Sequence, residues 1–437
     1  MTGGIQNIGR IPELQRRILF TLGMLAVYRV GTKVVTPGIN PDVVRHFFEQ
    51  QVSGNVFALF NVFSGGALEQ LSIFALGIMP YISASIIMQL LTIVLPPLEA
   101  LRKEGERGQR QITQYTRYGT VALAFFQSTL ISIALEGGSF GAGAVLVPGW
   151  GFRLMCMLTL TTGTAFIMWL GEQITERGIG NGILLVIFSG IVVRIPAGLA
   201  QLLELVRTDQ FSLLQVLILF GFVVALTGFV VFVERGQRRI PIQHARRVVG
   251  RRITQGGMSY FPLRVNTASV IPPIFASSLL IFPTTVAQFT ENGGAVQRFF
   301  QDYLFPGGAL YNALYIGLII FFAFFYTAIV INPDDVADNI KRSGGFIPGI
   351  RPGKKTAEFI DTVLSRITLV GALYVAAICI TPVLLSRRFG VPFYFGGTAL
   401  LIVVGVSMDL MAQIEAHLLS RQYEGFVHGS RMRGRLG

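Results

Sequence analysis

The sequence has little charge and few residues of the kinds that build disulfide or metal sites. Only 14% of its 437 residues are charged and 52% are hydrophobic, whereas soluble domains carry about 25% charged residues. The two cysteines, Cys156 and Cys379, each lie inside an apolar segment, and no CxxC pair or Cys/His cluster occurs. We interpret both as small packing residues and expect neither a disulfide framework nor a metal site.

Motifs for catalysis are also missing. The four histidines have no metal-ligand spacing; they are His46, His244, His417 and His428. Residues 349–356, GIRPGKKT, faintly resemble a phosphate-binding loop, but the loop is one residue short, follows no strand and contains a proline. We therefore expect no enzymatic activity and no cofactor, so that energy for any transport must come from a partner or a gradient.

What the sequence does contain is apolar blocks of a length that a bilayer core requires, about 20 residues each. The apolar residues do not form the amphipathic stripes of soluble helices. Backbone groups cannot stay unpaired in lipid, so the blocks are predicted to be helices. The sequence thus predicts an all-α membrane protein with ten transmembrane helices at 18–36, 72–95, 118–135, 152–170, 182–203, 212–233, 265–288, 309–331, 367–386 and 393–416.

Lysine and arginine in the connections predict the orientation. Arg10, Arg16 and Arg17 precede the first apolar run, which no small-residue cleavage site follows, so we expect a retained span with a cytoplasmic N-terminus. The two long connections, about 234–264 and 332–366, are strongly basic and should project into the cytoplasm, and the C-terminus lies there too. The net charge of +13 therefore follows from topology and does not predict direct DNA binding.

The even number of spans predicts two halves of five helices, 1–203 and 204–437. Because five is odd, the second half begins on the opposite side of the membrane. This arrangement is typical of an inverted pseudo-symmetric repeat around a central path, although no clear sequence repetition links the halves.

Residues 56–71, VFALFNVFSGGALEQL, are apolar but too short to cross a membrane. Such a piece can fold into a protein-lined cavity from the outer side. The alternative is a peripheral helix on the outer surface.

The positions of the ionisable residues argue against a solute transporter, the competing functional class. Transporters place such residues near the middle of their spans. Here Glu172, Glu176 and Glu234 lie at span ends, and Asp409 lies toward the cytoplasmic half.

Two isoleucine pairs and three prolines each allow a structural and a functional interpretation. Ile78 with Ile82, and Ile183 with Ile187, are four residues apart and share a helix face. Such faces are usually packing or lipid surface, but an apolar constriction can also close a pore by excluding water. Pro80 and Pro272-Pro273 fall within spans two and seven, where they predict kinks that serve either packing or hinge motion.

Several long motifs, in order along nearly the whole chain, resemble the SecY family of protein-conducting channels. They are FNVFSGGAL (60–68), SIFALGIMPYISASIIMQLL (72–91), KEGERGQRQITQYTRYGT (103–120), MWLGEQITERGIGNGI (168–183), VVFVERGQRRIPI (230–242), VIPPIFASSLLIFP (270–283), FFYTAIVINPDDVADNIKRSGGFIPGIRPGKKT (324–356) and VPFYFGGTALLIVVGV (391–406).

The resemblance implies a central hourglass pore that translocates unfolded preproteins. Its waist would be an apolar ring of six isoleucines, Ile78, Ile82, Ile183, Ile187, Ile274 and Ile402. A plug at about 57–70 would rest on the outer side of the ring, with small residues that let it leave easily; its members are Asn61, Phe63, Ser64, Gly65, Gly66, Ala67 and Leu68.

The resemblance also implies a lateral gate that releases transmembrane segments into lipid. The gate positions would be Pro80, Ser83, Gln89, Asn266, Pro272 and Phe282. Polar residues such as Gln89 and Asn266 would hold the closed gate by hydrogen bonds until an apolar signal peptide displaces them.

The family's partners follow in the same way. Arg251, Arg252 and Arg351 in the basic connections would dock the motor ATPase SecA or the ribosome, because arginine suits acidic protein surfaces and RNA phosphate alike. A single arginine can equally serve topology alone. SecE and SecG would complete the complex in the bacterial cytoplasmic membrane, and preproteins and membrane lipid would be its clients and surroundings.

Overall fold

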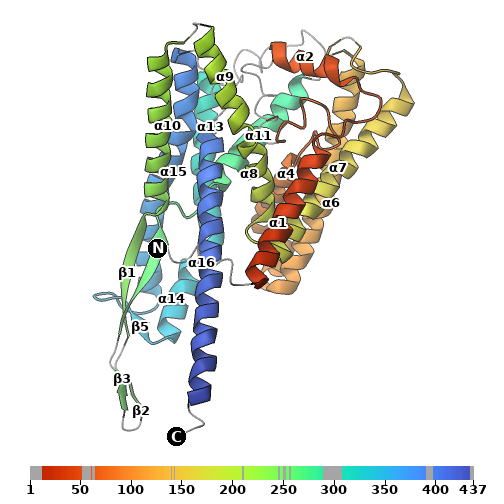
Figure 1. Cartoon of the computed structure of the whole chain (residues 1–437). Helices are drawn as coiled ribbons and strands as arrows, with labels where there is room; N and C mark the ends of the chain where they lie inside the picture. Colours follow the sequence, from red (N-terminus) through yellow and green to blue (C-terminus); the bar gives the residue numbers. More distant parts are fainter. Residues whose placement is uncertain are drawn as a thin grey trace. The chain divides into compact units, whose positions relative to one another are not determined.

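The computed structural model of the chain describes residues 12–51, 61, 64–138, 140–141, 143–208, 211–244, 247–249, 252–254, 257–288, 308–389 and 397–433. These residues are mainly helical, with short strands in one region (Figure 1). The chain divides into two compact units. The first comprises Met1–Gln201, Ile281–Pro306 and Gly405–Gly437, and the second comprises Leu202–Leu280 and Gly307–Val404. The division into sequence halves at 203/204 stays a prediction.

Seven spans of the described chain are long and apolar enough to cross a membrane, and α4 with α5 makes an eighth if this bent pair is one span. The seven spans are built from α6 (Glu106–Glu136), α7 (Trp150–Arg177), α8 (Gly182–Val192) with α9 (Ile195–Arg207), α10 (Leu213–Glu234), α13 (Ala309–Val330), α15 (Lys354–Phe389) and α16 (Gly397–Arg433). The bent pair, α4 (Met79–Val94) and α5 (Pro96–Lys103), turns by 97°. The other two predicted spans overlap α1 (Pro12–Gly31) and α11 (Ile271–Gln288), which are not among those spans, so the count of ten spans stays a prediction.

Pro80 of predicted span two and Pro272 and Pro273 of predicted span seven lie at helix starts and do not kink the helices. Helix α4 begins at Met79, so Pro80 lies in its first turn, and residues 73–78 form turns. Pro272 and Pro273 likewise lie in the first turn of α11. The first N–H groups of a helix have no intrahelical acceptor, so proline removes no hydrogen bond there. The predicted mid-span kinks at these prolines are therefore wrong.

In the first unit, the chain after the plug packs tightly among α1, α7 and their neighbours. The ring of Phe74 stacks on Tyr28 of α1 and on Phe166 of α7, with centroids 5.9 Å apart in both pairs. Gly31 and Gly163 leave the space for Phe74 and for the backbone of Ile73, because a Cβ at either glycine would overlap them. The first unit also contains α2 (Pro41–Gln51).

In the second unit, strands connect the two basic segments that were predicted as separate projecting loops. β1 (Gln237–His244) pairs antiparallel with β4 (Met258–Arg264) on one edge and with β5 (Gly345–Phe346) on the other. A short hairpin joins β2 (Arg247–Val249) to β3 (Arg252–Thr254). The burial of β1 alternates, as in a sheet with one covered face.

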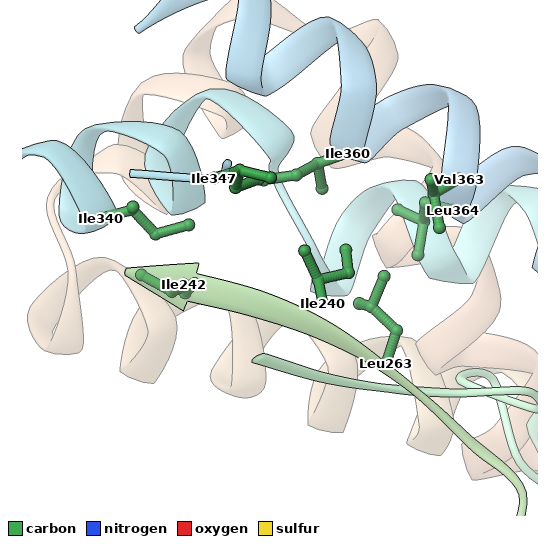
Figure 2. Close-up of a cluster of buried hydrophobic side chains, with 8 residues drawn as sticks. All are labelled: Ile240, Ile242, Leu263, Ile340, Ile347, Ile360, Val363 and Leu364. Atoms are coloured by element: carbon green, nitrogen blue, oxygen red, sulfur yellow. The ribbon is translucent and has the colours of Figure 1, made fainter. Parts of the chain in front are cut away.

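Helix α14 (Pro333–Arg342) and the start of α15 cover that face. Asn332 caps α14, since its side chain accepts a hydrogen bond from the backbone N–H of Asp334 at 3.2 Å. Figure 2 shows a cluster of buried side chains from the strands, the helices and the residue that follows β5: Ile240, Ile242, Leu263, Ile340, Ile347, Ile360, Val363 and Leu364. We call β1, β4, β5, α14 and the first turns of α15 the sheet module.

Candidate functional site

Ile78 and Ile82, the first predicted ring pair, lie at the start of α4. The N–H of Ile82 donates to the carbonyl of Ile78 at 3.1 Å, so the two residues are one turn apart on one face. Their side chains are 1% and 4% exposed. The prediction that they share a face is therefore confirmed.

Ile183 and Ile187, the second pair, lie in the first two turns of α8. The side-chain oxygen of Asn181 accepts hydrogen bonds from the N–H groups of Ile183 and Leu184, at 3.1 and 3.4 Å, and so caps the helix. A Cβ added at Gly171 of α7 would lie 3.1 Å from Cγ1 of Ile183. The cap and the close approach of α7 together fix the place of Ile183, while Ile187 is fully buried.

Ile274 of α11 and Ile402 of α16 belong to the second unit. Both side chains are buried there. The convergence of all six isoleucines in one ring stays a prediction.

The described plug residues form a compact, buried turn. The N–H of Gly66 donates to the carbonyl of Asn61 at 3.0 Å, and the N–H of Ala67 donates to the carbonyl of Ser64 at 3.3 Å. Residues 64–71 are turns, so a peripheral helix is excluded for that part. The buried plug residues are Asn61, Ser64, Gly65, Ala67 and Leu68, with Gly66 half-buried, and Phe63 lies outside the described residues.

Gly65 is required at its position for two reasons. Its φ is +66°, in the left-handed region that glycine tolerates best. A Cβ there would also lie 2.8 Å from the Cα of Gly190 in α8. The turn therefore approaches α8 backbone to backbone.

Side chains from α1 and from the end of α8 hold this turn. The hydroxyl of Tyr28 donates to the carbonyl of Ser64, and Nη1 of Arg29 donates to the carbonyl of Gly65, both at 3.0 Å. The carboxylate of Glu69 forms an ion pair with Arg194 and accepts a hydrogen bond from Nδ2 of Asn61. Arg29, Glu69 and Arg194 were not predicted from the sequence, where the available signal was an acidic residue directly after SGGAL.

The polar residues predicted for the lateral gate have hydrogen bonds within their own units. Nε2 of Gln89 donates to the hydroxyl of Ser85 at 3.1 Å, whereas its Oε1 is buried and has no partner in the described part of the chain. Nδ2 of Asn266 donates to Glu234 at 2.7 Å and to the carbonyl of Ser269 at 3.1 Å. Ser83 is half-buried.

The side chain of Phe282 lies outside what the structure describes, although its backbone belongs to α11. The assignment of a gate to these positions, including Pro80 and Pro272, stays a prediction.

Arg351, the predicted docking arginine, is exposed on the turn that joins β5 to α15. Its carbonyl accepts a hydrogen bond from the hydroxyl of Thr356 at 3.1 Å. Arg252 belongs to β3, and Arg251 lies outside the described residues. Other exposed basic residues of the sheet module and its edges are Arg238, Arg239, Arg264, Lys341, Arg342, Lys354 and Lys355.

Cys156 and Cys379 are both buried and belong to different units. Within the residues that the structure describes, no group of three or more His, Cys, Asp or Glu side chains could hold a metal ion.

Solved structures of similar fold are protein-conducting channels. One, in which the plug domain of the SecY protein is described as stabilising the closed state of the translocation channel, has a TM-score of 0.66 at 18% identity and covers 94% of this chain and 96% of its own. Canine Sec61 in a ribosome–channel complex has a TM-score of 0.63 at 17% identity, with the same coverage. These likenesses confirm the predicted helical membrane fold, to which the structure adds a few short strands.

Sequence relatives carry the family assignment. The protein translocase subunit SecY of Escherichia coli (strain K12) is 52% identical over 429 residues, which cover 98% of this chain and 96% of that protein. The SecY family model matches residues 72–411. The resemblance found in the motifs is thus confirmed, and the chain belongs to the SecY family.

Proposed function

We propose that this chain is the protein-conducting channel of a translocase, and that it moves unfolded preproteins across the bacterial cytoplasmic membrane. The observation that carries the proposal is the 52% identity to a protein translocase subunit across 98% of the chain. The SecY family is not a family of enzymes, so the chain supplies the path and a partner supplies the energy.

The waist of the path is the ring of Ile78, Ile82, Ile183, Ile187, Ile274 and Ile402. Branched apolar side chains attract water and ions weakly, so a narrow ring of them resists ion flow without a solid wall. They also offer no hydrogen bond or charge to a passing chain, so no segment is held there. The burial of Ile78 and Ile82 at the start of α4 and of Ile187 in α8, with Ile183 half-buried, supports this role.

The plug closes the path from the outer side. Its support is the buried turn at residues 64–68 and the backbone contact between Gly65 and Gly190. A turn held by a few hydrogen bonds can leave and return without unfolding its neighbours.

The lateral gate releases apolar segments into lipid, because burial of about 20 apolar residues in hydrocarbon is favourable. Oε1 of Gln89 is a buried acceptor without a hydrogen-bond partner among the described residues, which supports a gate position. Such an acceptor can bind a donor that is present only while the gate is in one of its states. Ser83, Asn266, Pro272 and Phe282 complete the proposed gate.

The partners are SecE and SecG in the membrane, and SecA or a ribosome at the basic sheet module. Exposed arginines and lysines on that module suit acidic protein surfaces and RNA phosphate. Canine Sec61 is described in a ribosome–channel complex, which supports the ribosome as one partner. Both termini lie in the cytoplasm.

The testing experiment is preprotein import into vesicles that contain this chain with SecE and SecG. Preprotein that becomes protected from protease only with SecA and ATP supports the channel. Absence of protection, with a folded complex that binds SecA, contradicts it. Solute uptake by the same vesicles would instead favour the transporter class.

A further inference from the structure

Glu69, directly after the buried part of the plug turn, links the plug to the fixed wall of the first unit. Its carboxylate forms an ion pair with Arg194, which lies just after α8, and it also accepts a hydrogen bond from Asn61 of the plug. The side chains of Glu69 and Arg194 are 39% and 17% exposed. One carboxylate therefore joins both ends of the plug turn to a partly buried arginine.

Arg29 approaches the same turn from α1. Its guanidinium donates to the carbonyl of Gly65, and a Cβ at the neighbouring Gly66 would lie 3.2 Å from Nη2 of Arg194. Both guanidinium groups carry positive charge, and they approach adjacent residues of the same turn. Glu69 is the carboxylate that pairs with Arg194, and the plug itself carries it.

We propose that Glu69, Arg194 and Arg29 form a latch that holds the plug closed, and that breaking the Glu69–Arg194 ion pair is a step in opening the channel. The inference rests on the proposed function. Glu69 and the two arginines are positioning residues for the plug, since none of them belongs to the ring. When the plug leaves, both the ion pair and the hydrogen bond from Arg29 are lost together.

The two plug glycines make the latch possible. Without a side chain at Gly65, the turn reaches the backbone of Gly190, and without one at Gly66, the guanidinium of Arg194 lies directly over the turn. The left-handed φ of Gly66, +87°, adds a second reason for glycine there.

The latch predicts that a neutral residue at position 69 increases the population of displaced plug. We expect Glu69→Gln to raise that population about tenfold, which corresponds to about 1.4 kcal/mol. The exchanged pair Glu69→Arg with Arg194→Glu should return the displaced population toward the parent value, because the two opposite charges attract one another again with their positions exchanged.

The experiment measures how fast a cysteine in the plug reacts with a membrane-impermeant maleimide. Ala67→Cys adds a thiol at a fully buried plug position, and the protein without this change is the blank because its own cysteines are buried. We expect labelling about tenfold faster with Glu69→Gln and near the Ala67→Cys rate with the exchanged pair. Glu204→Gln, which removes an exposed acid of α9, is the matched control.

Equal labelling rates with and without the Glu69→Gln substitution would overturn the latch. If Ala67→Cys prevents assembly, the resting ion conductance of Glu69→Gln and of the exchanged pair gives the same comparison without an added thiol. Conductance equal to that of the parent in Glu69→Gln would then overturn the latch. Labelling does not require transport, so the latch and the channel are tested separately. If preprotein is imported but the labelling rate does not depend on Glu69, only the latch is contradicted. If the labelling rate depends on Glu69 but no preprotein is imported, the latch is supported and the proposed channel is contradicted.

Discussion

Gly345 of β5 lies opposite His244 of β1, and this pair joins two basic segments that are far apart in the sequence. A Cβ at Gly345 would lie 2.7 Å from Cγ2 of Ile242. The contact between the two segments therefore depends on the missing side chain at position 345.

Gly345→Val should loosen the sheet module. The added side chain must displace Ile242 and its neighbours, and overpacking of this kind costs about 1–3 kcal/mol. Limited proteolysis in the segment that follows β5 measures the effect as faster cleavage. Gly257→Val is the control, because a Cβ at Gly257 meets no atom within 4 Å; equal cleavage of the two variants would contradict the prediction.

Smaller side chains at two ring positions should let ions pass through the resting channel. Ile82→Ala with Ile187→Ala removes apolar atoms from α4 and α8, so water can enter the waist. Resting conductance in lipid bilayers is expected to rise above that of the parent. The control, Ile87→Ala with Ile93→Ala, makes the same change at exposed positions of α4; a leak of equal size there would count against the ring.

Gly65→Ala should destabilise the closed plug. The residue has φ +66°, and strain of this kind costs roughly 1–3 kcal/mol, to which the contact with Gly190 adds. We expect a lower thermal unfolding midpoint and a resting leak. Gly23→Ala on α1 makes the same chemical change where a Cβ meets nothing within 4 Å, and it should leave both measurements unchanged.

Arg351→Glu should reduce SecA-driven translocation while membrane insertion and fold stay intact. The side chain is exposed and its backbone anchors the turn through Thr356, so reversing its charge alters the surface more than the packing. Preprotein import into vesicles measures the loss. The control is Arg107→Glu, which reverses another exposed positive charge. Normal import with Arg351→Glu would contradict a docking role for Arg351.

Local signals in the sequence were sufficient to place helices at the predicted spans and to predict the shared face of Ile78 and Ile82. Span length depends on runs of consecutive apolar residues, and the four-residue spacing of Ile78 with Ile82 fixes a shared helix face in advance. The start of α4 could not be read in this way. The backbone N–H of Ile73 donates to the carbonyl of Val34 at 2.9 Å, so residues before α4 make a long-range contact although the apolar run predicted a helix there.

The sequence by itself determined that the chain is a multi-span membrane protein of the SecY family, because hydropathy and long ordered motifs do not depend on distant contacts. Only the tertiary structure decided that β5 joins the hairpin of β1 and β4, and that Arg29 and Arg194 meet the plug turn. Both results depend on partners far apart in the chain, which approach only because glycines leave space for them. A local sequence pattern does not indicate which distant residue will occupy that space.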